Sequence, residues 1–269
     1  SSTPHAMNII NRGRDEITFQ ANHYMNTHLS VSRRIRLIPD SSIIEFESTI
    51  GNQGEVPQFY SLWLNFVPGN EFIPWIPVRD KRKVLIFTDP VNGGNILPWG
   101  ASWCGAKKGN IVWLLHISPK DMDPDGFFYS WQGPVNGENI RTFEVIQGKR
   151  LVAPGKNNLH KFRLMVFTGL TQLQAVYCNW GIGGRLENGT MVLEVAAAAN
   201  SPQIDAEVYL VGPEDEKAKV GSILIPPLRT GENRRYTLVL SPQSQFRNHR
   251  IEVVIDGTRL ELPRDYRKY

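Results

Sequence analysis

Hydrophobic and polar residues alternate with a period of two along most of the chain. In the segment 42–50, Ile44 and Phe46 alternate with Glu45 and Glu47. Such alternation is typical of a half-buried antiparallel strand, because successive side chains of a strand point to opposite faces. No window of a dozen residues keeps apolar positions at helical spacing between capping residues. The pattern therefore predicts an all-β chain.

The predicted strands fall into two series, each strand bounded by clusters of Gly, Pro, Asn or Asp. The first series predicts a large antiparallel, supersandwich-like domain, and the second predicts a smaller immunoglobulin-like β-sandwich. The last two strands flank Asp256-Gly257, a pair that tolerates the positive φ of a tight hairpin turn. The first series comprises segments 16–24, 31–38, 42–50, 58–66, 83–87, 110–117, 140–146 and 159–167, and the second comprises 191–195, 206–211, 220–225, 234–240, 250–255 and 258–262.

The Gly-rich stretch 180–184 separates the two series. It predicts a first domain over residues 1–180 and a second over 181–269. The length of 269 residues accommodates two domains, since single domains most often have roughly 100–150 residues.

Composition narrows the class of protein. The chain is 41% hydrophobic and 10% aromatic with seven Trp, which fits a packed globular protein and excludes a disordered or collagen-like one. Its net charge is only +4 and it has no long basic stripe interleaved with aromatics, so we expect no nucleic-acid binding. It also has no apolar run near the roughly 20 residues that cross a bilayer.

The sequence thus predicts a soluble protein and leaves a secreted and a cytoplasmic location open. Its first residues lack a signal-peptide pattern, which fits a mature secreted chain as well as a piece of a longer protein. Cys104 and Cys178 are compatible with a disulfide or with two unpaired thiols, and we favour the unpaired state.

Four tryptophans, Trp75, Trp99, Trp103 and Trp131, lie in or beside Pro- and Gly-rich segments, where we expect loops. Loops often carry binding residues, and an aromatic face packs well on the apolar C–H face of a sugar ring. These side chains are therefore predicted to bind carbohydrate, with closure of the sandwich ends as the alternative.

Other aromatic residues are expected to serve the core. Trp63 and Trp113 lie inside apolar strands, and His116 follows on the apolar strand 111–117. We expect all three to be buried, His116 as a hydrogen-bonded histidine rather than a metal ligand.

Asp121, Asp123 and Asp125 alternate before Gly126, as oxygen ligands do at the start of a calcium loop. Gln132 stands where that loop would have a bidentate Glu. A calcium site and an acidic turn between strands both remain open.

Three segments, in order along the chain, resemble the galactose mutarotase-like supersandwich. The first is the strand pair RIRL and IEFESTIGNQGEVP, the second is YSLWLNF, and the third is FEVIQG followed by APGK and FRLMVF. The resemblance covers roughly residues 15–170. It implies a role in carbohydrate chemistry, because the family includes aldose epimerases and modules of glycoside hydrolases and polysaccharide lyases. The first part of the family's sandwich has no counterpart here, which implies a reduced sandwich or one completed by another chain.

The resemblance also assigns residues. Glu144 matches the base that removes the proton of the anomeric hydroxyl, with a surface carboxylate as the alternative reading. Asn65 stands where the family has its catalytic His, and since an amide does not supply a proton, the epimerase mechanism is in doubt. Arg141 and Gln147 are placed to hydrogen-bond sugar hydroxyls or to face water.

Together these features predict a carbohydrate-binding or accessory module of a carbohydrate-active protein. The first alternative is a sugar-processing enzyme, of aldose epimerase, glycoside hydrolase or polysaccharide lyase type, with Glu144 as base. The second is a structural or assembly protein whose aromatic residues fill interfaces with other chains.

Overall fold

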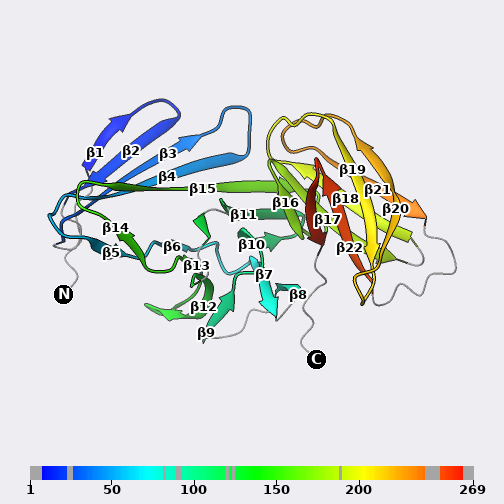
Figure 1. The fold of residues 1–269 in the computed structure, drawn as a ribbon, viewed down its shortest axis with the longest axis horizontal. Helices are drawn as coiled ribbons and strands as arrows, with labels where there is room; N and C mark the ends of the chain where they lie inside the picture. The colour runs from blue at the N-terminus through cyan, green and yellow to red at the C-terminus, as the bar shows by residue number, and fades with distance from the viewer. Residues whose placement is uncertain are drawn as a thin grey trace.

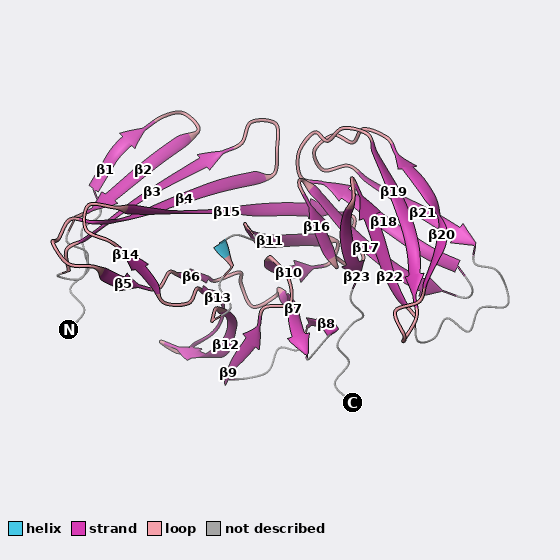
Figure 2. Ribbon diagram, in the orientation of Figure 1, coloured by secondary structure: helices cyan, strands magenta, loops and turns pink. Residues whose placement is uncertain are grey.

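The computed structural model describes residues 8–22, 27–80, 83–88, 93–118, 121–122, 125–187, 190–239 and 249–262. Within these ranges the chain forms strands β1 to β23 and no α-helix, so the predicted all-β class is confirmed (Figure 2). Accordingly, no helix in this part of the chain has the length and hydropathy to cross a membrane.

A nine-stranded antiparallel sheet forms the larger layer of the first sandwich. The long strand β15 lies at its centre and joins the N-terminal strands to the later ones (Figure 1). In spatial order its strands are β1 (Asn8–Arg12), β2 (Glu16–Ala21), β3 (Leu29–Leu37), β4 (Ile43–Asn52), β15 (Asn157–Thr168), β11 (Ile111–Ile117), β10 (Trp103–Lys108), β7 (Ile73–Asp80) and β8 (Lys83–Phe87).

One face of this sheet carries two smaller sheets. Leu64, Phe128 and Phe143 of the four-stranded sheet pack on Leu115 and Phe162 of the large sheet in one buried cluster. A two-stranded ribbon covers the other end of the same face over a smaller cluster. The four-stranded sheet contains β6 (Trp63–Phe66), β13 (Glu138–Ile146), β12 (Phe127–Val135) and β9 (Gly93–Pro98), and the ribbon contains β14 (Arg150–Val152) and β5 (Gln58–Tyr60).

The C-terminal strands form two four-stranded sheets around a core of their own, with Trp180, Val195, Val208 and Val253 among its buried residues. The hairpin β22–β23 turns at Asp256-Gly257 with positive φ at both residues, as predicted. One sheet contains β16 (Ala175–Tyr177), β17 (Trp180–Glu187), β18 (Thr190–Ala197) and β21 (Asn233–Val239), and the other contains β20 (Lys217–Ile225), β19 (Ile204–Val211), β22 (Arg250–Ile255) and β23 (Thr258–Leu262).

The Gly-rich stretch 180–184 lies within β17. A side chain at Gly183 would collide with the backbone oxygen of Gln172, and one at Gly181 would crowd Phe167. The glycines therefore permit the segment before β16 to pass close over β17. The division at residue 180 and the immunoglobulin type of the second sandwich stay predictions.

The two sandwiches share a buried apolar cluster. Trp103 and Phe167, on the second face of the nine-stranded sheet, pack with Leu173 and Ala196. Nearby, the backbone N–H and the hydroxyl of Ser42 both donate to the carbonyl oxygen of Ala198, at 2.8 and 3.0 Å. This junction has the character of a protein core.

The predicted loop positions of three tryptophans are wrong. Trp75, Trp103 and Trp131 lie in strands β7, β10 and β12, and the first two are buried. Pro74 and Pro77 fit within β7 because residues 73–75 pair with β10 and residues 76–80 pair with β8, so each proline faces a single neighbouring strand.

Two further tryptophans differ in exposure from what was predicted. Trp99 follows β9 and is buried, stacked on Phe128 with ring centroids 5.6 Å apart. Trp63, expected in the core, is 61% exposed because it shares a face of β6 with Asn65 while Leu64 points inward. Trp113 packs partly buried against the first core, as expected.

Candidate functional site

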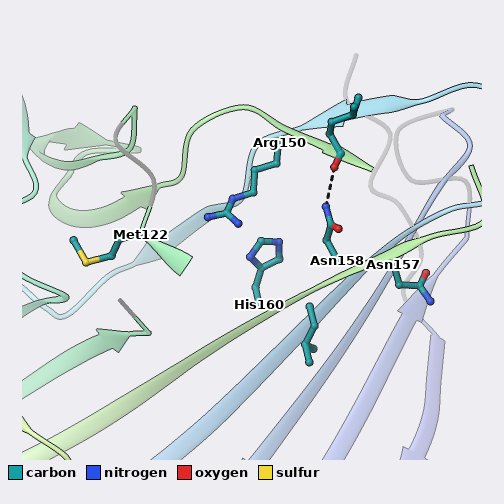
Figure 3. A pocket seen from close by; sticks show the side chains of 7 residues that line it. Met122, Arg150, Asn157, Asn158 and His160 are labelled. Carbon is teal, nitrogen blue, oxygen red and sulfur yellow. Dashed lines mark hydrogen bonds between the residues drawn. The ribbon is translucent and has the colours of Figure 1, made fainter. Parts of the chain in front are cut away.

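A pocket of about 500 Å³ lies between strands β14 and β15, where the two-stranded ribbon crosses the end of the nine-stranded sheet (Figure 3). The side chains of Arg150 and His160 extend into the space between the two strands. Polar and apolar groups alternate around it: the lining residues are Met122, Arg150, Leu151, Asn157, Asn158, Leu159 and His160.

His160 is the most deeply buried of these residues, at 1% exposure. It pairs across β15 and β4 with the fully buried Ser48, which pairs in turn with Arg33 of β3. Arg33 Nε donates to Ser48 Oγ at 3.0 Å. Because residues two apart share a face of a strand, this polar row lies between the apolar residues Phe162 and Ile50.

Tyr60 and Asn158 complete the hydrogen-bond network around His160. The Tyr60 hydroxyl is 2.7 Å from His160 Nε2, and Asn158 Nδ2 donates to the Tyr60 oxygen at 2.9 Å and to the Leu151 carbonyl at 3.0 Å. Tyr60 accepts from Asn158, and donating its own proton to Nε2 gives that proton a partner as well. This arrangement favours the tautomer that has the imidazole proton on Nδ1.

Burial keeps both members of this pair neutral at pH 7. The pKa of His160 is lowered, first by burial and then by the nearby Arg150 charge, with Asp121 opposing. The pKa of Tyr60 is raised, chiefly by burial. A neutral imidazole in contact with a phenol can pass a proton in either direction, so the pair is suited to hydrogen bonding with a ligand and to proton transfer.

Asp121 and Gln147, both predicted site residues, lie next to the pocket. The Asp121 carbonyl oxygen accepts from Gln147 Nε2 at 3.0 Å and from Arg150 at 2.8 Å. Within the described ranges, the buried atoms Asp121 Oδ2, Gln147 Oε1 and His160 Nδ1 have no hydrogen-bond partner. A buried polar atom without a partner costs free energy, so these atoms favour a polar ligand.

The other predicted polar residues lie on the four-stranded sheet and not in the pocket. Glu144 of β13 pairs directly with Asn65 of β6, so the structure places the two residues of the family resemblance side by side. Glu144 is 6% exposed and accepts hydrogen bonds from Trp63 Nε1 at 2.8 Å and Thr142 Oγ1 at 2.7 Å.

Arg141 is buried and holds neighbouring backbone in place. Its guanidinium donates to Gln132 Oε1, at 3.1 Å from Nε and 2.8 Å from NH2, and to the carbonyl oxygen of Phe72. Burial lowers the pKa of this guanidinium. These contacts give Arg141 a structural role in the fold, beside the sugar contact predicted for it.

The calcium prediction falls partly outside the described residues, since Asp123 lies there. Asp121 is buried and Asp125 lies in an exposed turn. In the described part of the chain, no three His, Cys, Asp or Glu side chains gather where they could hold a metal ion. The calcium site stays a prediction.

Tyr60, Arg150, Asn158 and His160 were missed from the sequence. The sequence does contain a signal for two of them. Asn158 and His160 are spaced by two residues from each other and from Phe162, a core residue of the same strand, so the three side chains lie on one face. Polar residues that continue a buried face indicate a buried polar cluster.

The lowered pKa values of two histidines are expected to make the folded protein less stable as pH falls. Burial, and then Arg163, lower the pKa of His116 to about 4, and the pKa of His160 is lowered too. The unfolded chain therefore binds more protons than the folded one as pH falls below the usual histidine pKa of about 6.5. We expect His116 alone to cost about 2 kcal/mol of unfolding free energy between pH 7 and pH 5.

Urea unfolding at the two pH values measures this loss. The variant His116→Gln, which cannot take up a proton, should lose about 2 kcal/mol less than the wild type on the same shift. Equal losses in the two proteins would show that His116 does not carry the effect.

No family model matches this sequence, and no curated protein sequence matches it. Solved structures similar to the chain include the Slr1438 protein of Synechocystis sp. PCC 6803, at 12% identity and a TM-score of 0.46. The match covers 60% of this chain and 65% of Slr1438, so this chain spans less than two thirds of the length of that protein. Two further similar structures carry the name of the family that the sequence resembles. One is a galactose mutarotase related enzyme from Lactobacillus acidophilus, at 11% identity and a TM-score of 0.42, with 62% of this chain and 72% of that chain covered. The other is a galactose mutarotase-like protein from Lactobacillus casei, at 10% identity and a TM-score of 0.42, with 60% of this chain and 72% of that chain covered. The TM-scores of these three structures are all below 0.5.

Proposed function

We propose that this protein binds carbohydrate and that the pocket between β14 and β15 holds one sugar unit. The observation that carries the proposal is the buried His160, whose Nδ1 has no hydrogen-bond partner in the described part of the chain, at the wall of a pocket of about 500 Å³. Small-molecule sites combine such a volume with apolar walls and a few convergent polar groups.

The lining suits a sugar on both counts. Arg150, Asn157 and Asn158 supply polar groups, while Met122 and Leu151 supply apolar surface. A pyranose ring presents hydroxyls that both donate and accept, together with apolar C–H groups. In the tautomer that Tyr60 favours, His160 Nδ1 offers a donor to such a hydroxyl.

Titration calorimetry with a broad panel of neutral and acidic oligosaccharides tests the proposal. We expect saturable binding by the wild type and at least tenfold weaker binding by His160→Gln, because about 1.4 kcal/mol of lost hydrogen bonding is a factor of ten. Lys161→Ala is the matched control, since Lys161 follows His160 on β15 but points to the opposite face and pairs with Glu47.

Two outcomes contradict the proposal. If no oligosaccharide binds, the assembly role proposed from the sequence becomes the better reading. If a sugar binds equally well to the wild type and to His160→Gln, the binding site lies elsewhere on the molecule.

A second candidate function is proton transfer on a bound sugar, favoured by the 2.7 Å contact between Tyr60 and His160. In an elimination at a uronate, a base takes the proton next to the carboxylate, the glycosidic C–O bond breaks, and the leaving oxygen takes up a proton. Arg150 lines the same pocket and supplies a positive charge that would hold the carboxylate. Ultraviolet absorbance of the new carbon–carbon double bond, followed during the titrations with acidic sugars, reports this reaction.

Glu144 does not line the pocket, because it lies on β13 of the four-stranded sheet. It could therefore act as a base only on a sugar bound to that sheet. Its hydrogen-bond partners there, Trp63 and Thr142, are both donors.

A further inference from the structure

The outer face of the four-stranded sheet carries a row of side chains that the core does not use. In register across β6, β13, β12 and β9, Asn65 pairs with Glu144, Glu144 with Tyr129, and Tyr129 with Ile96. Their neighbours along each strand point into the core, as Phe143 does. Since Ile96 is 68% exposed and Trp63 is also largely exposed, this face is open to solvent.

Glycines shape the aromatic part of this face. A Cβ at Gly94 would collide with the Tyr129 ring, and a Cβ at Gly133 would collide with the Trp131 ring. Both rings therefore lie down against the backbone of the sheet. An aromatic ring in that position presents one face to solvent, which is the geometry that stacking and cation–π contacts require.

Glu144 lies among these aromatic residues without a cation. Both of its carboxylate oxygens accept hydrogen bonds from neutral donors, Trp63 and Thr142. No ion pair involves Glu144 within the described residues. A largely buried carboxylate without a positive partner is electrostatically costly, so a positively charged ligand group would be favoured here.

We propose that this outer face is a second carbohydrate site and that it takes glycans with free ammonium groups, such as oligomers of glucosamine. The sugar rings stack on Trp63 and Trp131, and one ammonium pairs with the Glu144 carboxylate between them. Charge complementarity selects this class, because an N-acetylated sugar of the same backbone offers no positive charge. The inference takes its ligand class from the proposed function but uses a different surface.

Titration calorimetry with glucosamine oligomers and with N-acetylglucosamine oligomers of the same linkage and length tests the proposal. We expect at least tenfold tighter binding of the glucosamine oligomer, and weaker binding as salt is raised, because salt screens the charge contact. Equal affinities for the two oligomers, or binding of neither, would overturn the proposal.

Variants separate the two surfaces. Glu144→Gln keeps an oxygen that can accept the Trp63 hydrogen bond but removes the charge, so we expect at least a tenfold loss of affinity for the glucosamine oligomer. Glu138→Gln, an exposed position at the start of the same strand, is the matched control and should bind as the wild type does. His160→Gln should also leave this binding unchanged. A loss in His160→Gln and none in Glu144→Gln would place the oligomer in the pocket and overturn the second site.

Discussion

Trp103→Ala is expected to lower the free energy of unfolding by about 3–5 kcal/mol, the range for large aromatic residues removed from a core. Trp103 is 1% exposed and lies in the cluster that joins the two sandwiches, together with Phe167, Ala196 and Ala198. Its indole N–H has no partner among the described residues, so the loss comes from packing. Urea unfolding followed by far-ultraviolet circular dichroism measures it.

Two further variants test whether packing is the cause. Trp103→Phe keeps most of the apolar volume and should lose clearly less than the alanine variant, because the residual cavity is smaller. Ile96→Ala removes an exposed side chain and should stay within about 0.5 kcal/mol of the wild type. Unchanged stability in Trp103→Ala together with lost sugar binding would instead restore the binding role that the sequence predicted for Trp103.

Trp103 illustrates what local sequence does and does not determine. The Asp256-Gly257 turn was predicted correctly because two adjacent residues set its backbone angles. The environment of Trp103 depends on Phe167 and Ala196, which are far away in sequence. Nearby Gly and Pro residues suggested a loop, whereas the strand pairing that buries the side chain is non-local.

The candidate site shows the same division. The resemblance led to Gln147, which lies beside the pocket, and to Glu144, which lies on another sheet. Tyr60 and His160 are 100 residues apart, and they meet only because the β14–β5 ribbon crosses the end of the large sheet. Period-two alternation identifies a strand but does not say which strands will lie face to face.

Arg185→Ala is expected to cost about 3 kcal/mol, the lower end of the range for breaking a buried ion pair, because Arg185 is partly exposed. Arg185 NH1 lies 2.8 Å from Glu194 Oε1, and Thr171 donates to Glu194 Oε2 from its backbone N–H at 2.9 Å and its hydroxyl at 2.6 Å. Thr171 belongs to the segment between β15 and β16, so Glu194 fastens the connection between the two sandwiches. Without Arg185, this buried carboxylate loses the ion pair that it forms among the described residues.

The dependence on pH identifies that carboxylate as the source of the loss. Burial alone would raise the pKa of Glu194, but the bonds from Thr171 and Arg185 outweigh it and lower the pKa. The stability that the pair contributes is thus present above the usual glutamate pKa and is lost as pH falls through the lowered value. The difference between wild type and Arg185→Ala in urea unfolding should therefore be large at pH 7 and shrink in acid. The double variant Arg185→Ala/Glu194→Gln should be more stable than Arg185→Ala at pH 7, since its amide oxygen still accepts from Thr171 and no charge is left unpaired. A difference that stays constant with pH, or a double variant no more stable than the single one, would mean that Arg185 acts through packing instead.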